Sequence, residues 1–145
     1  AMGKTIVPMR KDDEGTMRSV RIPEHMDVVA DMVCGAQLHM QLSSATGLIG
    51  PDEAFIFGDR GTLRYSDKRL FGGQKGEDGL KEIIIPEEED GSWRVEEEFI
   101  NAIRGREKVK LTTFEDGVKY MEFTEAVNRS IATGRAVSLP LCLDG

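Results

Sequence analysis

Two β-rich runs separated by a single glycine limit the possible folds more than any other feature. Residues 26–34 form the first run, residues 36–46 alternate cleanly, and Gly35 stands between them. A period of two residues is typical of a strand with one packed face and one wetter face. One glycine between two such runs indicates a tight turn, so the sequence predicts an antiparallel hairpin. Its apolar face is expected to carry Met26, Val28, Ala30, Met32, Cys34, Ala36, Leu38, Met40 and Leu42.

Shorter runs predict further strands at residues 16–22, 53–57, 62–65, 81–85 and 136–139. Turn residues at 58–61 separate two of these runs and predict a second hairpin. The glycine-rich segment 72–79 is expected to be a loop.

Two helices are expected at the end of the chain, over residues 93–104 and 114–133. The first has an amphipathic stripe, with Ser92 as its expected N-cap. Thr113 and Asp116 have the spacing of a capping box, and Gly134 is the expected stop of the second helix. Its apolar residues lie on two sides, which predicts a second packing surface besides the sheet. One side carries Val118 and Met121, and the other carries Tyr120, Phe123, Val127 and Ile131.

These elements predict an α+β fold: a mostly antiparallel open sheet of about six or seven strands, with two C-terminal helices packed on one face. A length of 145 residues fits one domain. Residues 1–15 are expected to be a flexible or non-native lead-in, and residues 16–145 a single domain.

Composition excludes several classes of function. The net charge of −7 disfavours a nucleic-acid partner, and no apolar stretch is long enough to predict a membrane span. Two histidines and two scattered cysteines do not form a zinc motif. Cys34 and Cys142 are expected to be small buried residues in a reducing, cytoplasmic compartment, with a disulfide as the main alternative.

The motifs of cofactor binding and catalysis are also missing. No GxGxxG or Walker loop is present, and Gly72–Gly76 does not begin a predicted helix. The acidic residues 87–90 and 96–98 lack EF-hand spacing and are expected to be solvated, and no serine lies in a GxSxG context. The sequence therefore predicts no catalytic, cofactor-binding or metal-ligating residue.

A row of polar side chains is the candidate site. Gln37, His39 and Gln41 alternate along one predicted strand and project from one face of the sheet. Such a row is either a solvated or subunit-facing surface, or a set of contacts to substrate hydroxyl groups on a rigid strand.

Several motifs occur in an ordered series. They are FINAIRG at 99–105, TTFEDGVKYMEFTEA at 112–126 followed by Ser130, GRAVSLP at 134–140, IFGDRGTL at 56–63, and Gly35-Ala36 before an alternating strand. In order and spacing they resemble the C-terminal half of the glucose–fructose oxidoreductase / inositol dehydrogenase family, often written Gfo/Idh/MocA. The resemblance covers roughly residues 16–141.

The resemblance implies a parent with an N-terminal Rossmann domain that binds NAD or NADP, and a C-terminal sheet that mediates homo-oligomer formation. It implies a sugar, inositol or related polyol as substrate, held between the domains. The family's EKP motif, with the catalytic lysine, belongs to the half not present, and residues 23–27 do not fit its DxxxH spacing. The other reading is a complete, non-catalytic binding or scaffold domain that uses the open sheet face as an interface.

Overall fold

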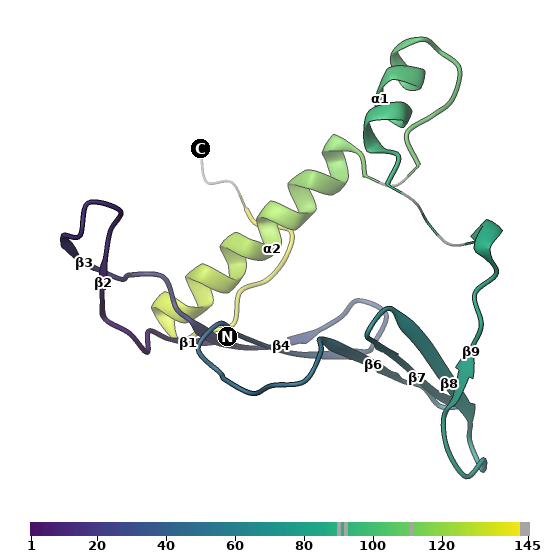
Figure 1. Ribbon diagram of the computed structural model, residues 1–145, viewed down its shortest axis with the longest axis horizontal. Helices are drawn as coiled ribbons and strands as arrows, with labels where there is room; N and C mark the ends of the chain where they lie inside the picture. Colours follow the sequence, from purple (N-terminus) through teal and green to yellow (C-terminus); the bar gives the residue numbers. More distant parts are fainter. Residues whose placement is uncertain (90, 92, 111, 143–145) are drawn as a thin grey trace. The chain divides into compact units, whose positions relative to one another are not determined.

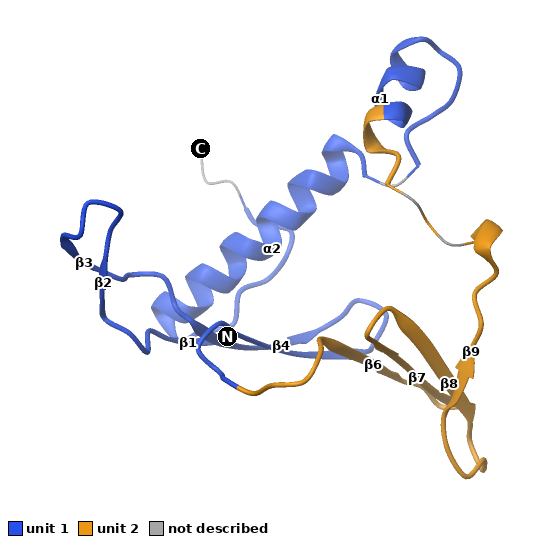
Figure 2. Cartoon of the chain, in the orientation of Figure 1, with its two compact units in different colours: residues 1–47, 97–145 blue, residues 48–96 orange. Residues whose placement is uncertain are grey.

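The computed structural model describes residues 1–89, 91, 93–110 and 112–142, and these form antiparallel strands followed by two α-helices (Figure 1). The predicted α+β class is confirmed. Asp90 and the expected N-cap Ser92 lie outside the described residues. The chain divides into unit 1, residues 1–47 and 97–145, and unit 2, residues 48–96 (Figure 2). The described strands are distributed over three sheets, of three, two and four strands, instead of the single sheet that we expected.

The main sheet of unit 1 has the order β1–β4–β5, formed by β1 (Met2–Lys4), β4 (His25–Asp31) and β5 (Gln37–Ser43). The predicted hairpin is therefore confirmed. Gly35 has a φ of +86°, and its amide donates to the carbonyl oxygen of Met32 at 2.8 Å. Glycine adopts this left-handed conformation without the steric cost of a Cβ, so the turn closes at the expected residue.

Residues 1–15 supply two strands. Met2–Lys4 pairs with Asp27–His25, and β2 (Met9–Lys11) pairs with β3 (Met17–Ser19) in a separate hairpin. The buried carboxylate of Glu24 ties the segment before this hairpin to the main sheet. Its Oε2 accepts hydrogen bonds from the amides of Ile6 and Val7, at 2.9 and 2.6 Å, and its Oε1 pairs with the guanidinium of Arg10.

Helix α2 (Phe114–Thr133) packs against β1. A Cβ at Gly3 would lie 3.0 Å from Cδ1 of Ile131, so the absence of a side chain there lets the helix approach the strand closely. Ala126 and Ser130 are buried and Phe123, Val127 and Ile131 are half-buried, whereas Val118, Tyr120 and Met121 are exposed. The expected packing on the sheet is thus found for α2.

Helix α1 (Val95–Ile103) keeps its apolar stripe exposed, with Phe99 and Ile103 at 53% and 69% exposure. Glu98 was expected to be solvated, and this is wrong. It is buried, and its carboxylate accepts a hydrogen bond from the amide of Lys110 at 3.2 Å, because the chain returns past the helix after Gly105.

The capping box of α2 is present as predicted. Thr113 Oγ1 accepts from the amide of Asp116 at 3.2 Å, and Asp116 Oδ2 accepts from the amide of Thr113 at 3.2 Å. Gly134 ends the helix with a φ of +65°.

Replacing Thr113 with alanine is expected to lower the free energy of unfolding by about 1 kcal/mol, because the amide of Asp116 loses its acceptor Oγ1 and the carboxylate of Asp116 loses the hydroxyl donor. Urea denaturation followed by circular dichroism measures this loss. Replacing the preceding, exposed Thr112 with alanine is the matched control. Equal stability of the two variants would show that the cap contributes nothing.

Unit 2 is a four-stranded meander in the order β6 (Glu53–Phe57), β7 (Gly61–Ser66), β8 (Arg69–Gln74) and β9 (Lys81–Ile83). The predicted second hairpin is confirmed as β6–β7. Asp67 and Lys68 have φ values of +51° and +60° and form the two-residue turn between β7 and β8, as in a type I′ hairpin. On one face, the Arg64 guanidinium lies over the rings of Phe55 and Phe71 and pairs with Glu53.

Two expectations about strands and loops are wrong. Gly72 and Gly73 belong to β8 and not to a loop, because they pair with Leu63 and Thr62 of β7. Residues 136–139 are irregular and not a strand.

Candidate functional site

The register of the β4–β5 hairpin brings the three predicted site residues onto one face. Gln41, His39 and Gln37 lie opposite Asp27, Val29 and Asp31, and directly opposed residues in an antiparallel pair point to the same side. The same rule places Met2, Lys4 and His25 on this side of β1 and β4. We call this surface the polar face; its residues are Met2, Lys4, His25, Asp27, Val29, Asp31, Gln37, His39, Gln41 and Ser43.

Asp27 is the best-connected group of the polar face. Gln41 Nε2 donates to its Oδ1 at 3.1 Å, and His25 Nε2 lies 3.1 Å from its Oδ2. The hydrogen bond from Gln41, followed by that from His25, holds the pKa of Asp27 below its usual value. Further along the strand, Gln37 Nε2 lies 3.5 Å from Asp31 Oδ1. The polar face therefore carries an ionised carboxylate within a row of amide and imidazole groups.

The interpretation of the sequence missed Asp27 and His25. His25 begins β4 and is half-buried. A turn centred between Met32 and Ala36 pairs residues at equal distances from it, which already puts Asp27 opposite Gln41. The position of Gly35 in the sequence therefore already indicated that Asp27 lies opposite Gln41.

Ser43 lies opposite His25, so a serine, a histidine and an aspartate are neighbours on the polar face. The Oγ of Ser43 accepts hydrogen bonds from Thr46 Oγ1 at 2.8 Å and from the amide of Ala45 at 3.3 Å. These bonds tie Ser43, the last residue of β5, to the bend that follows the strand. Its hydroxyl oxygen is bonded to groups of the following bend, which is not the arrangement of a nucleophile activated by an imidazole.

Metal ligation is not supported by the described residues, which contain no group of three or more His, Cys, Asp or Glu side chains able to hold an ion. The expectation of buried cysteines is wrong, since Cys34 and Cys142 are both exposed and unpaired. Cys34 lies in the turn beyond the end of β4, where the predicted alternation no longer points a side chain into the sheet.

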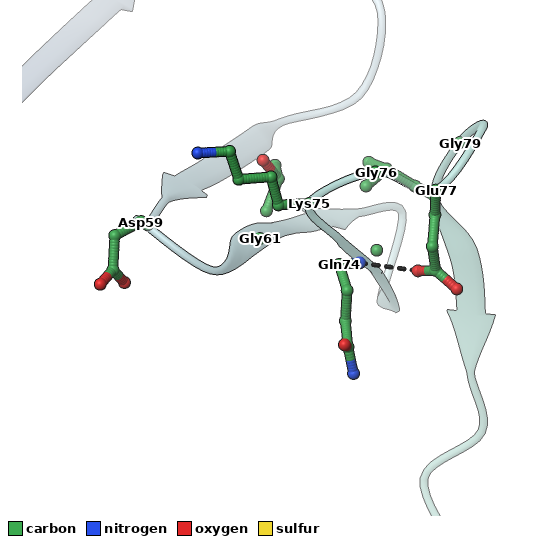
Figure 3. A pocket seen from close by; sticks show the side chains of 11 residues that line it. Asp59, Gly61, Gln74, Lys75, Gly76, Glu77 and Gly79 are labelled. Carbon is green, nitrogen blue, oxygen red and sulfur yellow. Dashed lines mark hydrogen bonds between the residues drawn. The ribbon is translucent and has the colours of Figure 1, made fainter.

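A glycine-rich hollow of about 490 Å³ lies at one end of the β7–β8 pair in unit 2. In Figure 3, the side chains of Asp59, Gln74 and Lys75 point in different directions. The carboxylate of Glu77 accepts from the amide of Gln74 at 2.6 Å and from Lys81 Nζ at 3.2 Å.

Backbone packing explains why glycines line this hollow. A Cβ at Gly73 would lie 2.8 Å from the carbonyl oxygen of Gly79, and a Cβ at Gly61 would overlap the carbonyl oxygen of Gly73. The glycines therefore serve close packing, and the charged side chains do not converge on a ligand.

No protein-family model matches this chain, and no curated protein matches it. None of the helices within the described residues combines the length and the apolar character needed to cross a bilayer. The case for the polar face as the candidate site consequently rests on its geometry.

Replacing Gln41 with alanine is expected to raise the pKa of Asp27 toward its ordinary value of 3.8, because the largest stabiliser of the charged carboxylate is removed. Titration of the Asp27 side-chain carboxyl carbon by NMR measures the change. Gln74→Ala, outside the polar face, is the control. An unchanged titration in the Gln41 variant would mean that the hydrogen bond does not form in solution.

Proposed function

We propose that this chain is the C-terminal substrate-side and association domain of an NAD(P)-dependent oxidoreductase of the Gfo/Idh/MocA type. Its substrate would be a sugar, inositol or related polyol. One observation carries the proposal: α2 packs against β1 at one edge of the β1–β4–β5 sheet, and the polar face of that sheet carries a row of hydrogen-bonding groups. The order of the motifs between residues 56 and 140 supports the family.

The exposure of apolar side chains supports a role within a larger protein. Among the described residues, Val28 and Ala126 are the buried hydrophobic ones, while Phe57 and Trp93 are 77% and 79% exposed. A chain of 145 residues ordinarily buries a larger core. Large exposed apolar areas are typical of surfaces that are buried in contacts with another domain or subunit. A Rossmann domain and a second copy of the chain are the partners that we propose.

The polar face fits either contact with a polyol or contact with a second subunit. Gln37, His39 and Gln41 supply amide and imidazole groups that both donate and accept hydrogen bonds. The proposed Rossmann domain would bind NAD or NADP, and this chain would add no catalytic residue. We place the protein in the cytoplasm.

Two measurements test the proposal. One is calorimetry with NADH and NADPH, and the other is the sequence of the gene upstream of this chain. We expect no binding of either nucleotide to this chain, and an upstream reading frame of about 120 residues, one ordinary domain, with a glycine-rich dinucleotide fingerprint. Micromolar binding of NADH by this chain would contradict the proposal, and so would a stop codon directly upstream.

The second candidate is a complete, non-catalytic binding or scaffold domain. The position of Asp27 favours it, because this carboxylate is already engaged by His25 and Gln41, as in a structural surface. A stop codon upstream, combined with a stable folded chain, would support this candidate over the first.

A further inference from the structure

Aspartate is followed by glycine at 78–79, 90–91, 116–117 and 144–145. In such a pair the side-chain carboxyl can close onto the next backbone amide, because glycine has no Cβ to hinder the approach and its backbone turns freely. Asp90 and residues 143–145 lie outside the described residues. The pairs 78–79 and 116–117 can therefore be compared directly, and their surroundings differ.

The pair 78–79 lies in the loop between β8 and β9, where Gly79 also borders the glycine-rich hollow (Figure 3). Both residues are exposed. Within the described part of the chain, the amide of Gly79 donates no hydrogen bond and the carboxylate of Asp78 accepts none. Nothing lies within 4 Å of the Cβ position at Gly79. Both reacting groups are thus free, and the space around them is open.

The pair 116–117 is held on each of these counts. The amide of Gly117 donates to the carbonyl oxygen of Thr113 at 3.0 Å. The carboxylate oxygen Oδ2 of Asp116 accepts from the amide and the hydroxyl of Thr113, at 3.2 and 2.9 Å. Asp116 is also half-buried in the first turn of α2. Ring closure there requires the helix turn and its cap to open first.

We propose that Asp78 is a site of spontaneous backbone isomerisation. The amide nitrogen of Gly79 attacks Cγ of the protonated Asp78 carboxyl; the N–Cγ bond forms, the Cγ–OH bond breaks, and one water molecule leaves with the amide proton. Water then hydrolyses the cyclic imide. Cleavage between the nitrogen and Cγ restores aspartate, and cleavage between the nitrogen and the main-chain carbonyl carbon of Asp78 gives isoaspartate. The sequence of steps needs no reactant other than water.

Isoaspartate changes both the chain and its chemistry. The main chain gains one atom between Asp78 and Gly79, shortly before Lys81 pairs with Gly72. The α-carboxylate of Asp78, formerly part of a peptide bond, becomes free and exposed. This is the group that protein isoaspartyl methyltransferases methylate, with S-adenosylmethionine as the donor. The aged loop is therefore a substrate for that class of repair enzyme.

Peptide mapping of the folded chain tests the proposal. The protein is aged in neutral buffer at body temperature and digested with trypsin, which releases residues 76–81 and 111–119 as separate peptides. The isomer has the same mass as the original peptide, a different retention time, and accepts a labelled methyl group from isoaspartyl methyltransferase. We expect it to accumulate in 76–81 at least about 10-fold faster than in 111–119, because only the second pair waits for local opening. A fresh sample corrects for isomer formed during digestion.

Two controls separate the structure from the dipeptide itself. In guanidinium chloride the two peptides should isomerise within about 3-fold of each other, because unfolding removes the protection of Asp116. Gly79→Ala is expected to slow the reaction at Asp78 several-fold in the folded chain, because the added Cβ hinders the attacking amide and meets no neighbour in the structure. Circular dichroism of this variant confirms that the fold is retained.

Three outcomes would overturn the proposal. The first is equal accumulation in the two peptides of the folded chain. The second is isomer at Asp78 in the unfolded chain and none in the folded chain, which would mean that the fold protects this loop. The third is a Gly79→Ala variant that isomerises as fast as the original protein.

Discussion

Replacing Gly61 with alanine is expected to unfold the β6–β9 sheet or to lower its stability by roughly 3 kcal/mol. The added Cβ would overlap the carbonyl oxygen of Gly73 and lie 3.1 Å from Cα of Gln74. Both obstacles are backbone atoms of the paired strand β8, so a change of rotamer cannot relieve them. Urea denaturation gives the stability, and hydrogen exchange of the amides in 53–74 locates the loss.

Gly79→Ala is the matched control for this prediction, because nothing lies within 4 Å of the Cβ position at Gly79. The two variants make the same chemical change, to the same residue type, in the same unit. Equal stability of the two would contradict the close approach of β7 and β8 at Gly61.

Replacing Glu24 with glutamine is expected to release the β2–β3 hairpin and to lower the Tm by roughly 5 °C. The carboxylate accepts from the amides of Ile6 and Val7 and from the guanidinium of Arg10. A glutamine amide has one acceptor oxygen and presents N–H donors where a second acceptor is needed. Differential scanning calorimetry gives the Tm, and hydrogen exchange at residues 6–19 shows whether the hairpin is freed.

The effect of this change depends on pH in a defined direction. The hydrogen bond from Val7, with that from Ile6 and the charge of Arg10, holds the pKa of Glu24 below its usual 4.5. The group therefore contributes its full stability above the unfolded pKa and loses it as pH falls through the lower folded value. The difference in Tm between the original chain and the Glu24→Gln variant should be constant around neutral pH and should shrink below about pH 4.5.

Glu82→Gln, at an exposed position of β9, provides the control for removal of one negative charge. A Tm loss in that variant equal to the loss in Glu24→Gln would assign the effect to net charge. If the difference in Tm between the original chain and Glu24→Gln did not change with pH, the carboxylate of Glu24 would not be the stabilising group.

The β4–β5 hairpin could be predicted because its signals are local. Alternation defines both strands, and Gly35 marks the turn, so the faces of Gln37, His39 and Gln41 followed from the sequence. Strand β1 could not be predicted in the same way. Met2–Lys4 has three residues, too few to show a period, and its pairing with β4 joins residues more than twenty positions apart.

The glycines of β8 were misinterpreted for a related reason. Gly72 and Gly73 weaken the local preference for a strand, so the sequence favoured a loop. Their tertiary neighbours reverse this preference, because a Cβ at Gly72 would lie 2.7 Å from Cδ1 of Ile83. The role of Glu24 was hidden in the same way, since its carboxylate contacts residues 14 to 18 positions earlier.

Helix α2 has buried side chains near its end and exposed apolar side chains over its first two turns. Phe114, Val118 and Met121 are exposed in its first two turns, whereas Ala126 and Ser130 are buried near its end. The capping box lies at the exposed end. The two halves of one continuous helix therefore depend on different forces. Amides near its start should exchange with solvent at a rate set by the helix–coil balance, and those near its end only when the helix detaches from β1.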